Sequence, residues 1–378
     1  MMNDENMERY WLWLCSCPGL YLNGLAGLIG YFQDPKTLYE ADARELIRWK
    51  KLEDRETTRW VHALMNYKES CTLAEAEARL ANRKLHFVSR YSRRFPGKLI
   101  HLPDCPYGLF YRGSLPDPSR PAVAVVGARL CSNYGRQMAM VLGKALAEDG
   151  YQVISGMAAG IDSTAQSSCL TANGSSFAVL GCGADVCYPE DSRALFDRLG
   201  KTGGILSEYP PMTPPLRAHF PMRNRLISGL SDAVIVVEAR DKSGSLITAD
   251  LALDQGKEVY AVPGRYNDLL SYGCNRLIEQ GAGIVLSKNS LLDNLAAAMD
   301  LKKVRPLGEE DERRIPPDLG EEERKVYAAL DSDARSVDEI AQASGLTLLQ
   351  SMRALMNLQL NNLAVEVSRN QFAVSIAS

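Results

Sequence analysis

The chain has 378 residues, of which 46% are apolar and 24% are charged, and its formal net charge is −3. These totals are typical of a globular protein with two or three domains and exclude a fibrous or disordered chain. No apolar run approaches the roughly 20 residues that span a bilayer, and the acidic start cannot form the basic region of a signal peptide. We therefore expect a cytoplasmic protein with no membrane partner.

The nine cysteines are an odd count without a secretory signal, which favours reduced thiols. Cys15 and Cys17, like Cys182 and Cys187, lack the second pair or the histidines that a zinc site needs. We expect buried thiols and no metal.

Basic residues are unevenly placed along the chain. Between Glu77 and Asp104 there are seven Lys or Arg residues and no carboxylate. A second carboxylate-free stretch, 209–230, contains Arg217, Arg223 and Arg225. Most charge runs are solvated faces, but two of them beside a loop of the phosphate-binding type favour a polyanionic ligand.

In chain order, residues 8–75 have the pattern of short helices, interrupted at Pro18-Gly19. Further helical segments are predicted at 42–48 and 53–67. The acidic charge of this region favours a small accessory domain, 1–78, of the SAM or helix-hairpin-helix type, over an independent DNA binder. Strand patterns then appear at 85–88 and 109–113.

The core domain is predicted to span 79–300 and to be of the α/β class, with an extended Rossmann-like parallel sheet. Near-continuous apolar strands alternate with helices, which is the pattern of a sheet covered on both faces. Ligands of such sheets bind at the carboxyl ends of the strands. The predicted strands are 122–126, 152–154, 176–180, 204–207, 233–238, 258–262 and 283–286.

Residues 121–165 organise this core, because two Val- and Ile-rich strands each end in a glycine turn and open a helix. Gly127 ends the first strand and Arg129 follows it; Ser155 and Gly156 end the second. A glycine turn before a helix favours an anion, most simply a phosphate. The dinucleotide fingerprint G-x-G-x-x-G is absent, and Arg129 stands where its second glycine would be.

Residues 301–320 are rich in charge and proline and are predicted to be a linker. The segment 321–378 has the pattern of a winged helix, with three helices and a final hairpin. Ser336 with Glu339, and Thr347 with Gln350, have capping-box spacing. The presumed recognition helix carries only Arg353 as a cation, so we do not expect it to bind DNA unaided.

Catalytic motifs are lacking. The sequence contains no G-x-S-x-G elbow, no H-E-x-x-H and no Walker loop. Asp162 more often caps its own loop than acts as a base. What remains is a row of anion-binding turns, which suits the successive phosphates of a polymer. Tyr134, Tyr188 and Phe220 are candidates for stacking bases, or equally for the core.

The ordered motifs resemble those of the DNA-processing protein A (DprA/Smf) family of bacterial transformation proteins. The resemblance covers about residues 85–290. Its motifs are the runs 125–129 (VVGAR), 155–162 (SGMAAGID), 179–183 (VLGCG), 206–210 (LSEYP), 220–229 (FPMRNRLISG), 243–249 (SGSLITA) and 273–278 (GCNRLI).

The resemblance implies a homodimer that binds single-stranded DNA and loads RecA onto it during natural transformation, without a cofactor or a catalysed reaction. Arg129, Arg223, Arg225 and Lys242 would contact the strand, and glycine and serine turns would offer backbone donors. The full set of residues expected at the DNA is Gly127, Arg129, Tyr134, Ser155, Gly156, Gly160, Arg223, Asn224, Arg225, Lys242, Ser243, Gly244, Ser245 and Arg265.

Three positions depart from the family pattern. Ala128 replaces a hydroxyl residue, Met222 stands where an arginine is common, and Ala159 is small where a charge is often found. An alternative is a nucleotide-binding or nucleotide-hydrolysing enzyme of the LOG phosphoribohydrolase type. The comparable turn, 243–250, lacks the double glycine and the glutamate of those enzymes.

Overall fold

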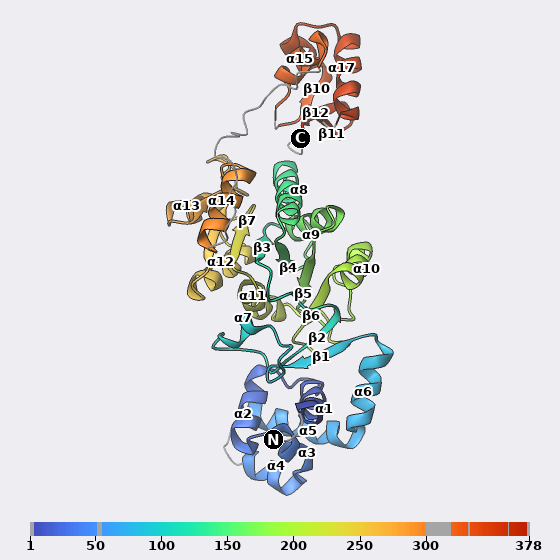
Figure 1. Ribbon diagram of the computed structural model, residues 1–378, viewed down its shortest axis with the longest axis vertical. Helices are drawn as coiled ribbons and strands as arrows, with labels where there is room; N and C mark the ends of the chain where they lie inside the picture. Colours follow the sequence, from blue (N-terminus) through green and yellow to red (C-terminus); the bar gives the residue numbers. More distant parts are fainter. Residues whose placement is uncertain (1–3, 51–54, 300–318, 332, 362, 376–378) are drawn as a thin grey trace.

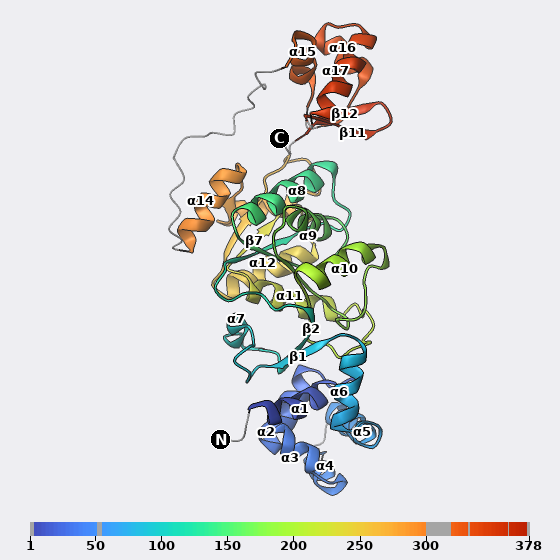
Figure 2. The same ribbon diagram turned by 45° about the vertical axis from the view of Figure 1, so that its right-hand side comes forward.

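The computed structural model describes residues 4–50, 55–299, 319–331, 333–361 and 363–375. A helical domain, a sheet domain and a winged helix follow one another along the longest axis of the molecule (Figures 1 and 2). Most of the predicted linker, 301–320, lies outside the described residues. None of the described helices is both long enough and apolar enough to cross a membrane.

The N-terminal domain is a cluster of helices that packs against one edge of the sheet. Its elements are α1 (Asp4–Cys15), α2 (Leu22–Phe32), α3 (Pro35–Glu40), α4 (Ala43–Lys50), α5 (Arg55–Ser70) and α6 (Leu73–Asn82). Helix α6 was not predicted. A capping box between Thr72 and Glu75 starts it, and it runs through residue 78, where the helical domain was predicted to end.

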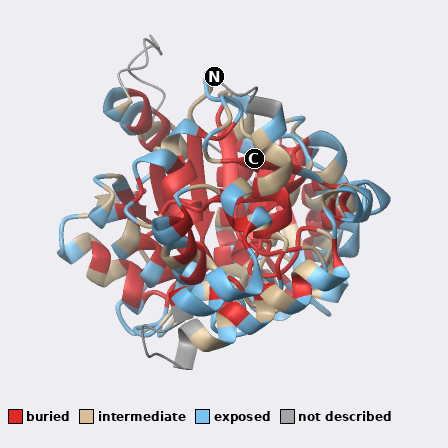
Figure 3. Ribbon diagram, turned by 90° about the horizontal axis from the view of Figure 1, so that it is seen from below, coloured by how far each residue is buried: buried red, intermediate tan, exposed pale blue. Residues whose placement is uncertain are grey.

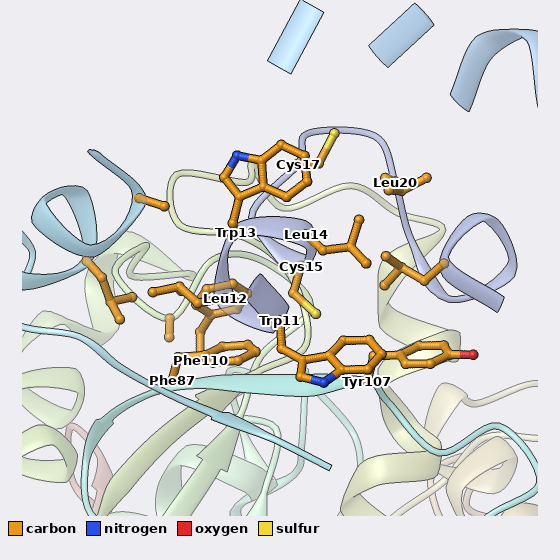
Figure 4. Packing of buried hydrophobic residues seen from close by; sticks show 14 of the residues in the cluster. Trp11, Leu12, Trp13, Leu14, Cys15, Cys17, Leu20, Phe87, Tyr107 and Phe110 are labelled. Carbon is orange, nitrogen blue, oxygen red and sulfur yellow. The ribbon is translucent and has the colours of Figure 1, made fainter. Parts of the chain in front are cut away.

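The core of the helical domain continues into the sheet. Trp13 is fully buried, and its indole Nε1 donates a hydrogen bond to the Cys71 carbonyl at 2.7 Å. Leu12 lies over Phe87 and Phe110 of the first two strands, and Trp11 lies beside Tyr107 (Figure 4). The domain is therefore packed onto the sheet and not merely tethered to it.

The sheet domain confirms the predicted α/β class. Its strands are β1 (His86–Ser89), β2 (Gly108–Gly113), β3 (Ala122–Val126), β4 (Gln152–Ser155), β5 (Ser176–Val179), β6 (Gly204–Ser207), β7 (Ala233–Val236), β8 (Glu258–Ala261) and β9 (Gly283–Ile284). Within the described residues their order is β1-β2-β6-β5-β4-β3-β7-β8-β9. Strands β3 to β9 are parallel as predicted, whereas β2 runs antiparallel to β6 and β1 antiparallel to β2.

Both faces of the sheet are covered because successive side chains point to opposite sides. Val123 and Val125 face one core, whereas Ala124 and Val126 face another. The helices of this domain are α7 (Gly97–Ile100), α8 (Asn133–Glu148), α9 (Ile161–Thr171), α10 (Arg193–Thr202), α11 (His219–Leu230), α12 (Gly244–Asp254), α13 (Tyr272–Glu279) and α14 (Lys288–Ala298), with a short 3₁₀ turn at Glu190–Ser192. Figure 3 shows buried residues along the central strands and on the inner sides of the helices.

The C-terminal domain has the predicted winged-helix order. Both predicted capping boxes form, at Ser336 and at Thr347, and Asn370 takes a left-handed turn in the hairpin. The elements are α15 (Glu321–Ala329), β10 (Arg335–Ser336), α16 (Val337–Ser344), α17 (Leu348–Leu360), β11 (Ala364–Ser368) and β12 (Gln371–Val374). Arg353 on α17 is ion-paired with Glu322 at 3.1 Å, which neutralises the lone cation of that helix.

Replacing Trp13 by Ala should lower the free energy of unfolding by about 3–5 kcal/mol, because the change leaves a cavity and an unpaired Cys71 carbonyl. Urea unfolding followed by circular dichroism measures the loss. The matched control is Tyr31→Ala on α2, where the side chain is 51% exposed; we expect a change within about 0.5 kcal/mol there. Equal losses for the two variants would contradict the packing described here.

Candidate nucleic-acid interface

The predicted ligand-binding turns meet at one edge of the sheet, because the carboxyl ends of parallel strands lie together. The segments that follow β3, β4, β5, β7 and β8 all emerge there. Helix α11 also begins at this edge, since His219 lies within 3.1 Å of the Gly181 carbonyl, just after β5. The structure thus brings the two main motifs, 125–129 and 155–162, beside the 220–229 motif.

A pocket of about 170 Å³ lies at the ends of β4 and β5. Its walls combine backbone turns, aromatic rings and two guanidinium groups. The lining residues are Arg129, Gly156, Ala158, Ala159, Leu180, Gly181, Cys182, Tyr188, Pro189, Phe220 and Arg223.

The two arginines lie against the same aromatic ring. The guanidinium carbon of Arg129 is 5.3 Å from the centroid of the Phe220 ring, and that of Arg223 is 5.9 Å from it. The Tyr188 ring is 5.6 Å from Phe220, centroid to centroid. Arg129 is exposed at the rim. The pocket therefore offers stacking surface next to positive charge, which suits a base with its phosphate.

Arg223 is a buried cation, 5% exposed. Its Nη1 donates to the carbonyls of Gly156, at 3.2 Å, and of Val179, so it bridges the ends of β4 and β5. Burial lowers the pKa of Arg223 to about 10, Asp162 opposes that shift, and the like charge of Arg129 adds to it. Arg223 therefore remains protonated at neutral pH.

Asp162 supports the pocket from below. Its carboxylate accepts a hydrogen bond from the Gly156 N–H at 3.1 Å and interacts electrostatically with Arg223. Burial raises the pKa of Asp162, and Arg223 opposes that shift. Asp162 therefore interacts with the buried Arg223, and Arg129 stays at the surface.

Close backbone packing holds the loop that carries Arg129. The Ile161 N–H donates to the Ala128 carbonyl at 3.2 Å. Gly160 has a φ of 83°, and a Cβ there would lie 2.3 Å from the Ala128 oxygen. Gly127 is equally confined, since a Cβ at that position would lie 2.7 Å from Ile161. These glycines allow two turns to touch.

The helix start after Gly127 is not free to bind a phosphate, which corrects the prediction for this turn. The Glu238 carboxylate, 1% exposed at the end of β7, accepts hydrogen bonds from the N–H of Ser132, at 2.9 Å, and from its hydroxyl. A Cβ at Gly135 would lie 2.3 Å from the Glu238 carboxyl carbon. The Glu238 carboxylate thus occupies the position at the N-terminus of α8 where an anionic ligand would bind.

Several other predicted site residues have structural partners. The Ser155 hydroxyl donates to the Val125 carbonyl at 2.6 Å, and the Tyr134 hydroxyl donates to the Pro263 carbonyl at 3.1 Å. Asn224 donates to the Gly244 carbonyl at 3.2 Å. Ser155 and Asn224 are buried, so they position the turns, whereas Tyr134 is half-buried and lines a neighbouring pocket.

Arg225 faces away from the pocket and is 3% exposed. It is ion-paired with Asp104, at 2.7 Å, and with Glu208, also at 2.7 Å. The carboxylates come from two loops outside the stretch 209–230, which is why that stretch alone did not reveal them. The expectation of a phosphate contact by Arg225 is therefore corrected to an internal role.

The remaining predicted residues lie farther along the same edge. Lys242 and Gly244 are exposed at the start of α12, while Ser245 is buried. The hydroxyls of Ser243 and Ser245 lie 2.8 Å apart. Arg265 is exposed and ion-paired with Asp333 of the winged helix.

Sequence reasoning missed two groups at this edge. Glu238 was predicted as the last residue of a strand at this edge, but its hydrogen bonds to the N-cap of α8 were not predicted. A carboxylate directly after an apolar strand was the sequence feature that could have indicated them. His219 stacks on Tyr209 at 3.9 Å and contacts Tyr21 of the helical domain. Burial lowers the pKa of His219, so it serves as a neutral support for the neighbouring Phe220. Of the family departures, Ala159 lines the pocket and Met222 is exposed.

Comparisons with known proteins agree with this architecture. The family model for DNA recombination-mediator protein A matches residues 86–296, and the model for the DprA winged helix domain matches residues 310–368. The DNA processing protein DprA of Streptococcus pneumoniae is 43% identical over 198 residues, which are 52% of this chain and 70% of that protein. Protein Smf of Escherichia coli is 37% identical over 278 residues, which are 73% of this chain and 74% of that protein.

Two solved structures are similar. The X-ray structure of DprA from Streptococcus pneumoniae matches with a TM-score of 0.64 and 33% identity, over 75% of this chain and 97% of that chain. A structure of DNA processing protein A from Helicobacter pylori, described by its single-stranded DNA binding mode, matches with a TM-score of 0.51 and 30% identity, over 57% of this chain and 96% of that chain. The chain therefore belongs to the DNA recombination-mediator protein A family, DprA/Smf.

Proposed function

We propose that this protein binds single-stranded DNA and acts as a recombination mediator, protecting incoming DNA and loading RecA onto it in the cytoplasm of a transformable cell. The observation that carries the proposal is the pair of guanidiniums, Arg129 and Arg223, that lie near the Phe220 ring in one pocket. Stacking next to positive charge is how proteins hold unpaired bases. The single-stranded DNA binding mode described for the Helicobacter pylori relative supports it further.

The proposal includes a homodimer. Exposed apolar side chains lie on neighbouring segments at the far edge of the sheet: Tyr266 and Leu269 after β8, Tyr272 at the start of α13, and Ile284 and Leu286 in and after β9. Exposed apolar side chains next to an edge strand are typical of an interface between subunits. A second copy bound through this edge would leave the pocket at the ends of β4 and β5 open.

We propose that the protein catalyses no reaction. The LOG-type alternative needs a nucleotide phosphate at the glycine turns of the Rossmann-like core. Here Glu238 occupies the start of α8, and its negative charge disfavours a phosphate at that turn. The turn 243–250 also lacks the glutamate of those enzymes.

Incubation with AMP should therefore give no free adenine above a protein-free control. Chromatographic separation of base and nucleotide measures the product. Base release in proportion to protein concentration would favour the enzyme.

Single strands should bind more tightly than duplexes of the same length. The cations lie in a pocket and in turns, and not on a helix shaped for the major groove, so a paired base cannot reach Phe220. A gel shift with labelled single and double strands over a salt series tests this. Equal affinity for the two forms would contradict the proposal.

Arg129→Ala should weaken single-strand binding by about 1.5–3 kcal/mol, which is roughly ten- to a hundred-fold. Arg129→Lys should recover only part, because an ammonium lacks the two-pronged geometry of a guanidinium. The slope of log affinity against log salt should fall by ~0.7 for the lost contact.

The matched control is Arg44→Ala, an exposed arginine in the helical domain. Neither variant should change the melting temperature by more than a degree or two, because surface substitutions rarely do. A lower melting temperature with an unchanged salt slope would assign Arg129 to stability and not to binding.

A further inference from the structure

The carboxylate-free basic stretch between Glu77 and Asp104 is not part of the pocket described above. Most of its second half lies in the segment 90–107, which connects β1 to β2. Ser89 lies opposite Gly108, and Phe110 lies opposite Ser207 at the carboxyl end of β6. The segment therefore emerges at the same edge of the sheet as the pocket.

An aromatic stack forms the base of this segment. Trp11, 4% exposed, is stacked with two tyrosine rings: Tyr107 at 5.4 Å and 19°, and Tyr91 at 5.0 Å and 26°. Figure 4 shows Trp11 beside Tyr107 above the first strands. Tyr91 is 55% exposed. An aromatic ring already packed on one side and open to solvent is a platform for a nucleic-acid base.

Cations surround this platform. The guanidinium of Arg90 lies 3.8 Å from the centroid of Tyr107 and 5.1 Å from that of Tyr91, and it donates to the Tyr91 hydroxyl at 3.0 Å. Arg93 and Arg94 are exposed on the next turn. Arg90 thus fixes the ring. Arg94 donates a hydrogen bond to the Tyr111 hydroxyl, so Arg93 is the neighbour at the surface that can meet a phosphate.

The buried residue Arg225 connects the platform to the pocket. It pairs with Asp104, in the same segment as Tyr91, and lies two positions after Arg223 on α11. Phe95, which is buried, anchors the segment in the core beneath. One rigid helix therefore holds both the pocket arginine and the loop that carries the platform.

We propose that Tyr91, with Arg93, is a second contact site for single-stranded DNA, at which a base stacks on the Tyr91 ring and a flanking phosphate meets Arg93. The inference rests on the proposed function and extends it. A strand held in the pocket by Arg129 would run along the sheet edge past β6 to reach this platform, so only a strand long enough to span both would use it.

A length series tests the proposal. Oligothymidines of about 4 and about 16 nucleotides cover the short and long ends of single-strand site sizes. Tyr91→Ala should weaken binding of the long strand about five- to a hundred-fold, as expected for the loss of one stacked base. It should leave the affinity for the short strand unchanged. Tyr91→Phe, which keeps the ring, should bind the long strand within about two-fold of the wild type.

Two further measurements separate stacking from charge and from general damage. Arg93→Ala should lower the salt slope for the long strand by ~0.7, whereas Tyr91→Ala should leave it unchanged. Tyr31 is an exposed tyrosine of the helical domain, so Tyr31→Ala is the matched control. It should change the affinity for neither strand. A photoreactive halogenated uridine in the long strand should cross-link to Tyr91.

Three outcomes would overturn the inference: long-strand affinity unchanged in Tyr91→Ala, equal losses for both lengths, or cross-links that avoid Tyr91. In each of them Arg129→Ala can still weaken the short strand, so the proposed function would stand. Failure of the wild type to bind either strand would remove the proposed function, and this inference with it.

Discussion

Helix α11 carries two buried guanidiniums two residues apart, and most of the ligand-binding edge depends on how they are satisfied. Arg223 is hydrogen-bonded to the ends of β4 and β5, and Arg225 is ion-paired with loops next to β6 and β2. A buried cation without partners is strongly unfavourable, so both side chains fix the segments around them. The loops of this edge are consequently held in place before any ligand arrives.

Local patterns in the sequence predicted the parallel strands, both winged-helix capping boxes and the general position of the ligand edge. Those features depend on periodicity and on contacts between residues a few positions apart. The antiparallel strands β1 and β2 were recognised as strands, but their membership of the sheet depends on pairing with β6, far along the chain. Arg225 was assigned to the surface for the same reason, since its carboxylate partners are distant in sequence.

The structure also distinguishes two kinds of anion site that share one sequence signature. The turn after β3 has a glycine and a helix start, but Glu238 accepts hydrogen bonds from the N–H and the hydroxyl of Ser132, the N-cap of that helix. In the turn after β4, the Gly156 N–H donates to the Asp162 carboxylate. The positive charge near this turn comes from the side chains of Arg223 and Arg129. Positive side chains, and not free backbone donors, therefore dominate this edge. Because of that difference, the expected ligand is a single strand of DNA along the sheet edge, and not a nucleotide bound at the turn after β3.

The helical domain has a consequence for solubility. Strand β1 is the outermost strand of the sheet on that side, and edge strands invite pairing with other chains. Glu8 of α1 accepts the Ser89 N–H at 2.8 Å, and α1 covers Phe87 and Phe110. Helix α1 therefore acts as a cover that keeps β1 from acting as a template for aggregation. A core domain expressed without it would expose both a free edge and aromatic side chains, and would need a replacement cover to stay in solution.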